Sequence, residues 1–167
     1  MRYQTKGKET TMRKNSQQIR EMLNAHGIKV TPQRIAVYAA LEELGHASAE
    51  QITAKVHDTF PTVTVGTIYN VLECFSTKGV ISKLNTSDNK MYFDVNIHDH
   101  HHLLCEETGE ILDFGDRELT ELVRAYYASH RMAGTDGFEV TDIRVQVIGN
   151  FRHNRSNHNR TTKIPTE

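Results

Sequence analysis

The stretch TVGTIYNVLECFSTKG, residues 64–79, decides how the rest of the chain is interpreted. Its apolar residues recur at helical spacing and form one stripe, made of Val65, Ile68, Leu72 and Phe75. Thr64 is placed to cap the first amides of such a helix, and Gly79 is placed to end it. The face opposite the stripe has small and hydrogen-bonding residues: Gly66, Thr67, Asn70, Glu73 and Cys74, with Tyr69 at the margin.

Two interpretations of this outer face are open. Small and hydrogen-bonding side chains on an exposed helix can enter a DNA major groove and reach base edges, which makes Gly66, Thr67, Tyr69 and Asn70 candidate DNA contacts. The alternative is an ordinary amphipathic helix whose polar face meets only water. The neighbouring segments favour DNA.

Three helices are expected before this stretch and a β-hairpin after it. Helix signals cover Ser16 to about Ala25, Pro32 to Gly45, and a capping box at Ser48 that starts a helix to about Thr59. After Gly79, two strand-like runs, Val80–Leu84 and Lys90–Val95, flank a turn-forming segment. Short helices followed by a hairpin are the plan of a winged helix-turn-helix.

A smaller module follows residue 95. We expect strands at His102–Cys105 and Glu110–Phe114, a helix at Asp116–Arg131, and a last strand at Phe138–Ile148. The fold class is therefore α+β, with an N-terminal winged helix-turn-helix and a small β-β-α-β dimerisation domain. A module of this size has difficulty burying its apolar faces alone, so the sequence predicts a homodimer.

Charge is distributed unevenly along the chain. Residues 1–94 contain 12 Lys/Arg against 9 Asp/Glu, residues 95–142 contain 3 against 11, and residues 143–167 contain 5 against 1. This partition is typical of a chain in which a basic module binds polyanions and an acidic module has a different role. We predict a disordered basic arm (1–14), a winged-helix domain (15–94), a hinge (95–99), a dimerisation and metal-sensing domain (100–150) and a flexible tail (151–167).

Several protein classes are excluded by composition. No apolar stretch approaches the roughly 20 residues that cross a bilayer, and the N-terminus does not resemble a secretory signal, so we expect a cytoplasmic protein without a membrane partner. The 2 cysteines, Cys74 and Cys105, cannot form a four-cysteine zinc site within one chain.

Histidine spacing predicts a metal site. His100 and His102 are two residues apart, and on an extended strand such side chains point to the same side. Asp94 ends the preceding strand, and Asp113 lies on the expected partner strand. Imidazoles with carboxylates suit Fe²⁺, Mn²⁺ or Zn²⁺. The alternative is a solvated, histidine-rich linker that binds metal only by accident.

The motifs together resemble the ferric uptake regulator (Fur) superfamily over roughly residues 20–150. The resemblance rests on Val30–Arg34, Gly45–Glu50, Val65–Leu72, Tyr92–Asp94, His100–Cys105 and Gly109–Phe114, which occur in the family's order. It implies a regulatory metal site of His46, Asp94, His100, His102 and Asp113, and so adds His46 to the set. It also implies a repressor that binds an inverted repeat of double-stranded DNA when metal closes the hinge.

Within the superfamily the chain is most similar to the peroxide-sensing regulators, which have Asp at both carboxylate positions and Asn after the helix Tyr. This similarity implies that bound Fe²⁺ reacts with peroxide and that oxygen is inserted into His46 or His100. The structural zinc of most members is expected to be absent, because its cysteine positions fall on Cys105, Thr108, Phe151 and Asn154. The resemblance also implies that the family's secondary metal site is incomplete here: Asp99 and His101 match its positions, but its Glu and His positions fall on Thr120 and Ile143. His101 is expected to point away from the main site, into solvent.

Other kinds of protein share parts of this pattern. A haem-responsive regulator using Cys105, or a zinc-responsive regulator of the same fold, stays open. A cupin-type metalloenzyme would use the H-x-H pair with Glu106, but the helical first half leaves no room for its barrel. A metal-storage or metal-chaperone module would have no use for a winged helix. We therefore expect a regulator and not an enzyme.

Overall fold

The computed structural model describes residues 13–86, 90–130 and 134–151 of the chain. These residues form two compact units, one ending at His98 and the other beginning at Asp99, here called the N-terminal unit and the C-terminal unit. The fold is α+β, as expected. Residues 1–12 of the expected arm (1–14) and residues 152–167 of the expected tail (151–167) lie outside the described residues.

Four helices form most of the N-terminal unit: α1 (Ser16–Ala25), α2 (Pro32–Leu44), α3 (Ala49–Val56) and α4 (Val65–Thr77). Each begins after a side chain that accepts a hydrogen bond from a first-turn amide, namely that of Asn15, Thr31, Ser48 or Thr64. The four expected helices are confirmed. The third is shorter than expected, because the chain leaves the helix after Val56 and residues 57–59 form turns.

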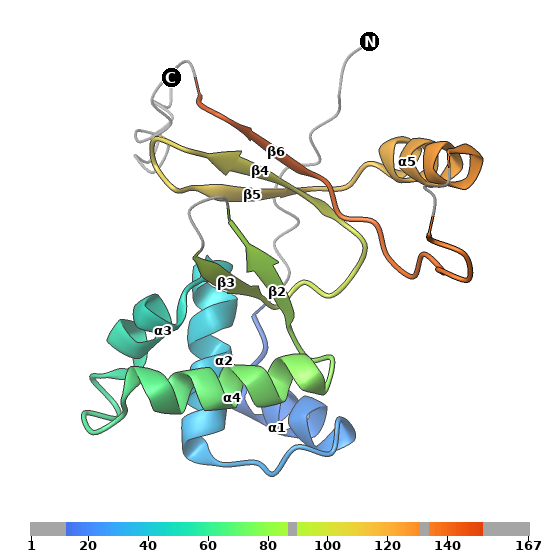
Figure 1. Cartoon of the computed structure of the whole chain (residues 1–167). Coiled ribbons are helices and arrows are strands. Elements are labelled where there is room, and N and C mark those ends of the chain that lie inside the picture. The colour runs from blue at the N-terminus through green and yellow to red at the C-terminus, as the bar shows by residue number, and fades with distance from the viewer. Residues whose placement is uncertain (1–12, 87–89, 131–133, 152–167) are drawn as a thin grey trace, which may run out of the picture. The chain divides into compact units, whose positions relative to one another are not determined.

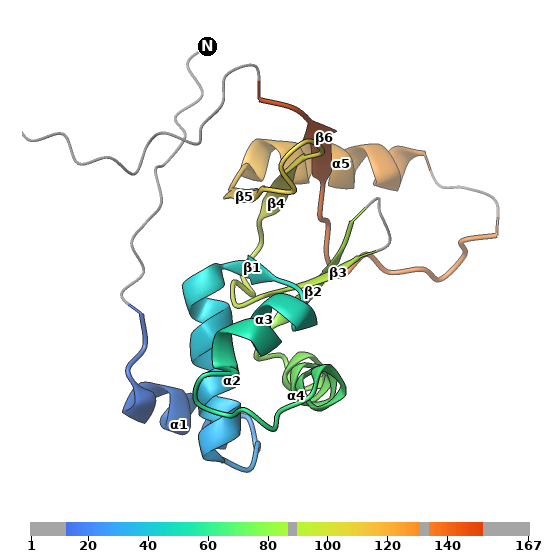
Figure 2. The same ribbon diagram turned by 90° about the vertical axis from the view of Figure 1, so that its left-hand side faces the viewer.

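The core of this unit lies where α2, α3 and α4 meet (Figure 2). Its fully buried side chains include Leu23, Leu41, Ile52, Ile68, Leu72 and Phe75. Ile68, Leu72 and Phe75 belong to the predicted apolar stripe of α4, whereas Val65 is only half-buried at its first turn. Each buried side chain of this kind contributes about 1.5–3 kcal/mol through removal from water, so the stripe fixes which face of α4 remains outside.

A three-stranded sheet completes the N-terminal unit, in the order β1-β3-β2. The expected hairpin is β2 (Ser82–Asn85) and β3 (Met91–Asp94), which pair antiparallel. The expected first run began too early, because Val80 and Ile81 are buried in the core before the strand starts. The strand β1 (His46–Ala47) was not expected, and it pairs antiparallel with β3.

The C-terminal unit is a second three-stranded sheet with one helix (Figure 1). Strand β4 (His101–Cys105) lies between β5 (Ile111–Phe114) and β6 (Gln146–Gly149), antiparallel to the first and parallel to the second. The connection from β5 to β6 contains α5 (Arg117–Ser129). The last strand is shorter than the expected Phe138–Ile148, because only residues 146–149 find a ladder partner on β4.

Helix α5 has no buried residue within this single chain. Leu122 is 67% exposed and Tyr126 is 64% exposed, and Val147 and Ile148 of β6 are also exposed. Among the described residues, no helix has the length and apolar character needed to cross a membrane.

Candidate metal centre and DNA-reading helix

The N-terminal unit contributes a histidine and a carboxylate from neighbouring strands. His46 of β1 and Asp94 of β3 are register partners, and 3.5 Å separates His46 Nε2 from Asp94 Oδ2. The backbone N–H of Asn96 donates to the other oxygen, Asp94 Oδ1, at 2.7 Å. That hydrogen bond fixes the carboxylate, so one oxygen is held by the backbone and the other faces the imidazole.

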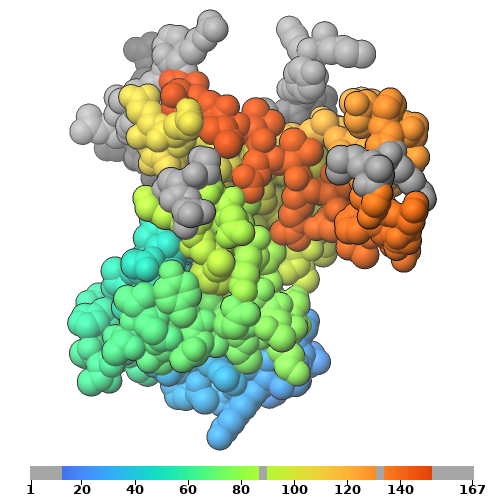
Figure 3. All heavy atoms as spheres, in the orientation of Figure 1, coloured from blue at the N-terminus to red at the C-terminus, as the bar shows by residue number. Residues whose placement is uncertain are grey.

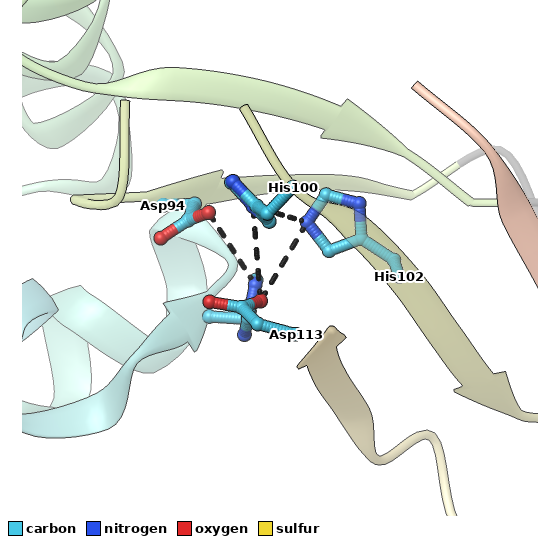
Figure 4. Close-up of side chains that lie close together, drawn as sticks. Asp94, His100, His102 and Asp113 are labelled. Atoms are coloured by element: carbon cyan, nitrogen blue, oxygen red, sulfur yellow. Dashed lines mark hydrogen bonds and ion pairs between the residues drawn. The ribbon is translucent and has the colours of Figure 1, made fainter. Parts of the chain in front are cut away.

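The C-terminal unit contributes two histidines and a second carboxylate. His100 precedes β4 and His102 lies within it, and their Nε2 atoms approach to 2.9 Å. Asp113 of β5 is the register partner of His102, and its Oδ1 lies 3.7 Å from His100 Nε2 and 3.8 Å from His102 Nε2. Figure 4 shows these three side chains converging. Strand alternation and strand pairing thus place the three donors as the sequence predicts.

The chemistry of these donors fits a divalent transition metal. The five residues offer one atom each, three imidazole nitrogens and two carboxylate oxygens. Asp94 is 2% exposed, and His100 and His102 are 4% and 0% exposed. Burying ionisable groups is unfavourable unless they are paired or bind a metal. Imidazole nitrogens with carboxylate oxygens, which each unit offers, suit Fe²⁺ and Mn²⁺, and also Zn²⁺.

His101 lies on the other side of β4 and has structural partners. Its Nδ1 accepts a hydrogen bond from the Val145 N–H at 3.3 Å, so its Nε2 carries the proton and faces the Asp116 carbonyl at 3.2 Å and Thr120 Oγ1 at 3.0 Å. It points away from His100 and His102 as expected, but it is 1% exposed and does not reach solvent. The residue links β4 to the start of α5 and to the chain entering β6.

Cys105 occupies the first of the four positions that the family resemblance assigns to a structural zinc site in other members. The Thr108 side chain, followed by backbone amides of Thr108, Phe151 and Glu107, lowers the pKa of this thiol below its ordinary value. Asn150 Oδ1 lies 3.7 Å from the Cys105 sulfur. Cys105, Thr108 and Phe151 therefore do meet, whereas Asn154 lies outside the described residues.

Helix α4 presents the candidate DNA contacts on its outer side. Gly66, Tyr69 and Asn70 are exposed and Thr67 is half-buried, its hydroxyl 3.0 Å from that of Thr64. In the space-filling view α4 spreads in green across the visible face of the N-terminal unit (Figure 3). A side chain added at Gly66 would meet only the Thr64 hydroxyl at 3.8 Å, so the fold itself does not require glycine there.

Tyr69 contacts two residues that the sequence did not single out. Its hydroxyl donates to Glu50 Oε1 of α3 at 3.4 Å, and its ring meets the Phe93 ring of β3 edge-on, with 6.3 Å between centroids. The sequence signal that bears on them is the capping box at Ser48, because it places Glu50 in the first turn of α3.

Sequence comparison identifies relatives of this chain. The sequence profile of the ferric uptake regulator family matches residues 25–148. A peroxide-responsive repressor PerR of Staphylococcus aureus (strain Mu50) is 38% identical over 128 residues, which is 76% of this chain and 82% of that protein.

Solved structures show the same fold. The ferric uptake regulator of Vibrio cholerae aligns with a TM-score of 0.66 at 25% identity, covering 80% of this chain and 99% of the other. The ferric uptake regulator of Pseudomonas aeruginosa, solved with manganese, aligns with a TM-score of 0.62 at 25% identity, covering 80% and 98%.

Proposed function

The chain belongs to the ferric uptake regulator family, and from that premise we propose that it is a cytoplasmic, homodimeric repressor that binds an inverted repeat of DNA with Fe²⁺ or Mn²⁺ and reports peroxide through Fe²⁺. As a member of this family it is a metal-dependent transcription regulator and not an enzyme. The observation that supports the proposal most is the pair of preassembled donor groups, His46 with Asp94 and His100 with His102 and Asp113.

One ion shared by the two donor groups would act as a clamp. The groups belong to different units, and Asp94 and His100 are joined by a segment that spans at most about 20 Å when extended. Once an ion binds one group, the other is therefore present at an effective concentration of about millimolar or more. Binding both groups would restrict how the two units move and favour one arrangement for DNA.

The peroxide response is supported by the residue types at the site. Both carboxylates are aspartates, Asn70 follows Tyr69, and the relative with 38% identity is named a peroxide-responsive repressor. When bound, Fe²⁺ supplies the one-electron chemistry that peroxide requires, which Zn²⁺ lacks. Oxidation of the His46 or His100 ring would remove a nitrogen donor from one of the two groups. The clamp would then open and the DNA would be released.

A homodimer is supported by the surface of the C-terminal unit. Regulators of this family bind DNA as dimers. In the single chain, α5 and β6 expose Leu122, Tyr126, Val147 and Ile148 to water. Burial of apolar surface of this extent against a second copy would contribute about 25 cal/mol for each Å² removed from water. Two copies would then present two α4 helices to the two halves of an inverted repeat.

Fluorescence anisotropy on an AT-rich inverted-repeat duplex tests this proposal, at fixed salt, with Mn²⁺ and then with chelator. We expect Mn²⁺ to tighten binding by about tenfold or more. His46→Ala and His100→Ala should lose that gain, whereas His57→Ala, which removes an exposed histidine outside both donor groups, should keep it. Equal binding with Mn²⁺ and with chelator would contradict the metal clamp. If the protein does not bind the duplex under either condition, the proposal that it regulates an operator of this kind is wrong.

A further inference from the structure

Tyr69 is held from two sides within the N-terminal unit. Its hydroxyl donates to Glu50 of α3, and its ring contacts the edge of the Phe93 ring of β3. Phe93 is 1% exposed and therefore fixed in the core, whereas Tyr69 is 39% exposed. One part of the tyrosine is thus anchored while the remainder is available to a partner.

Both residues that hold Tyr69 are linked through short stretches of backbone to the donor group of this unit. Phe93 precedes Asp94 on β3 and pairs with Ala47, which follows His46 on β1. Glu50 lies in the first turn of α3, which begins two residues after β1 ends. A change in the pairing of β1 with β3 would therefore act on Tyr69 through Phe93 and also through Glu50.

The pairing of β1 with β3 is suited to respond to a bound ion. Strand β1 has only two residues, so few ladder hydrogen bonds hold it, and short, weakly paired segments are the first to open locally. His46 and Asp94 face each other from the two strands at 3.5 Å. An ion held by both would tie the strands together at this point and order the residues adjacent to each strand.

Beside Tyr69 the surface is hollowed, so the Tyr69 ring has space to change its orientation. A hollow of about 550 Å³ is lined by Ser48, Glu50, Gln51, Tyr69, Lys90, Met91 and Tyr92. That volume is within the range of about 300–1,000 Å³ that small-molecule pockets occupy. If the hold of Glu50 or Phe93 loosens, the ring can leave the orientation in which it faces a partner.

Glu50 is otherwise poorly placed for a face that meets DNA, because a carboxylate repels phosphates. It nevertheless stays ionised. The Ser48 hydroxyl, then the amide of Glu50 itself, and the Tyr69 hydroxyl lower the pKa of this carboxyl below its usual value. Its negative charge lies in the first turn of α3, where the helix dipole favours it. The ionised Glu50 carboxylate is thus available as the acceptor for the Tyr69 hydroxyl.

We propose that Glu50 and Phe93 are positioning residues that transmit metal binding at His46 and Asp94 to Tyr69, one of the candidate DNA contacts of α4. This inference rests on the proposed function, since it presumes that metal at this site governs DNA binding. It adds a route of coupling inside the N-terminal unit, which operates beside the clamp between the units. Metal binding orders the β1–β3 pairing, and the ordered pairing fixes Tyr69 for base contact.

The test compares variants of the full-length protein in two separate measurements. Mn²⁺ affinity is measured on protein without DNA, by calorimetric titration. The metal gain, defined as the Kd for DNA with chelator divided by the Kd with Mn²⁺, is measured by anisotropy on the inverted-repeat duplex. The variants are Glu50→Ala, Glu50→Gln, Tyr69→Phe and Phe93→Leu. Glu43→Ala, which removes an exposed charge paired with Lys55 instead, is the matched control for charge.

We expect Glu50→Ala and Phe93→Leu to lower the metal gain by about fivefold or more while Mn²⁺ affinity without DNA stays within about twofold of wild type. Glu50→Gln, which keeps an acceptor for the Tyr69 hydroxyl, and Glu43→Ala should retain the wild-type gain. Glu50→Ala and Tyr69→Phe should not add in the double variant, because both remove the same hydrogen bond. Thermal melting establishes that each variant is folded, and Glu50 is exposed, so its variants do not depend on the tolerance of the core to Phe93→Leu.

Two results would overturn the inference while leaving the proposed function intact. In the first, wild type shows the metal gain and Glu50→Ala and a folded Phe93→Leu show it undiminished. In the second, Glu50→Gln loses as much gain as Glu50→Ala, so that charge and not the hydrogen bond matters. Absence of a metal gain in wild type itself would overturn the proposed function, and the inference with it.

Discussion

His46 faces Asp94 across a strand pairing in which β1 has only two residues, with 3.5 Å between Nε2 of the imidazole and Oδ2 of the carboxylate. Neither side chain owes its position to a long element of regular structure. His46 directly follows Gly45, the residue that ends α2, and Asp94 is the last residue of β3. The short pairing between them brings together a donor group that belongs wholly to the N-terminal unit.

Asp94→Asn is expected to abolish stabilisation by metal. A ligand that binds only the folded state raises the free energy of unfolding by about 2.7 kcal/mol when present at 100 times its Kd. Thermal melts with and without Mn²⁺ should therefore separate for wild type and coincide for Asp94→Asn. Asp58→Asn, at an exposed position of the same unit, is the control and should behave as wild type. An undiminished Mn²⁺ shift in Asp94→Asn would remove this residue from the site.

Peroxide is expected to release DNA only from the iron-loaded protein. Brief exposure of the Fe²⁺ form should abolish DNA binding and add one oxygen to a peptide containing His46 or His100, detected by mass spectrometry. The Mn²⁺ form should keep its DNA and its mass. DNA release that is accompanied by oxidation of cysteine or methionine alone would point to a different sensing residue.

Gly66→Ala should change stability and DNA binding in opposite directions. An added methyl group meets only the Thr64 hydroxyl at 3.8 Å, and alanine in place of glycine stabilises a helix by up to about 1 kcal/mol. DNA binding should weaken by about tenfold, the scale of one lost base-edge contact, because glycine permits close approach of the backbone. Denaturant unfolding and anisotropy measure the two effects.

Gly115→Ala is the matched control for that substitution, since an added methyl group there meets no atom within 4 Å and Gly115 lies in the C-terminal unit. It should leave DNA binding unchanged. Equal effects of the two substitutions on DNA binding would argue against a specific contact at Gly66.

Leu122→Lys in α5 is expected to produce monomers. Leu122 is 67% exposed in the single chain, and a charge there would have to be buried in the interface proposed for the dimer. Light scattering after gel filtration should give half the wild-type mass. Glu121→Lys, on the adjacent exposed position, should remain dimeric. A dimer that persists in Leu122→Lys would place the interface elsewhere.

The alkylation of Cys105 should follow a pH profile set by Thr108. The Thr108 side chain is the first cause of the lowered pKa of this thiol, so the thiolate forms at lower pH than in an ordinary cysteine. Thr108→Val should raise the pKa and move the midpoint of the rate against pH to higher pH. Iodoacetamide labelling of Cys105, followed peptide by peptide, measures it. An unmoved midpoint would show that the backbone amides alone determine the ionisation.

Much of the fold can be predicted from local signals in the sequence. The helices α1, α2 and α4 begin after Asn15, Thr31 and Thr64, because a polar side chain there satisfies amides that a helix leaves unpaired. The convergence of His100 with His102 follows from the two-residue repeat of a strand. The pairing of His102 with Asp113 follows from the tight turn between β4 and β5.

Other features depend on partners far away in the chain. Nothing within two residues of His46 indicates β1, because a two-residue strand exists only through its ladder with β3, about 47 positions later in the sequence. The burial of His101 depends on Val145 and Thr120, and the expectation that it faced solvent failed for that reason.

By itself, then, the sequence determined the capped helices, the outer face of α4, the alternation that directs His100 and His102 together, and the family to which the chain belongs. These features depend on neighbours within a few residues or on motif order. Only the tertiary structure decided that His46 opposes Asp94, that His101 is enclosed, and that Glu50 and Phe93 hold Tyr69. Each of these requires two segments distant in sequence to be brought into register, and the energy that does so comes from burying the core of the unit.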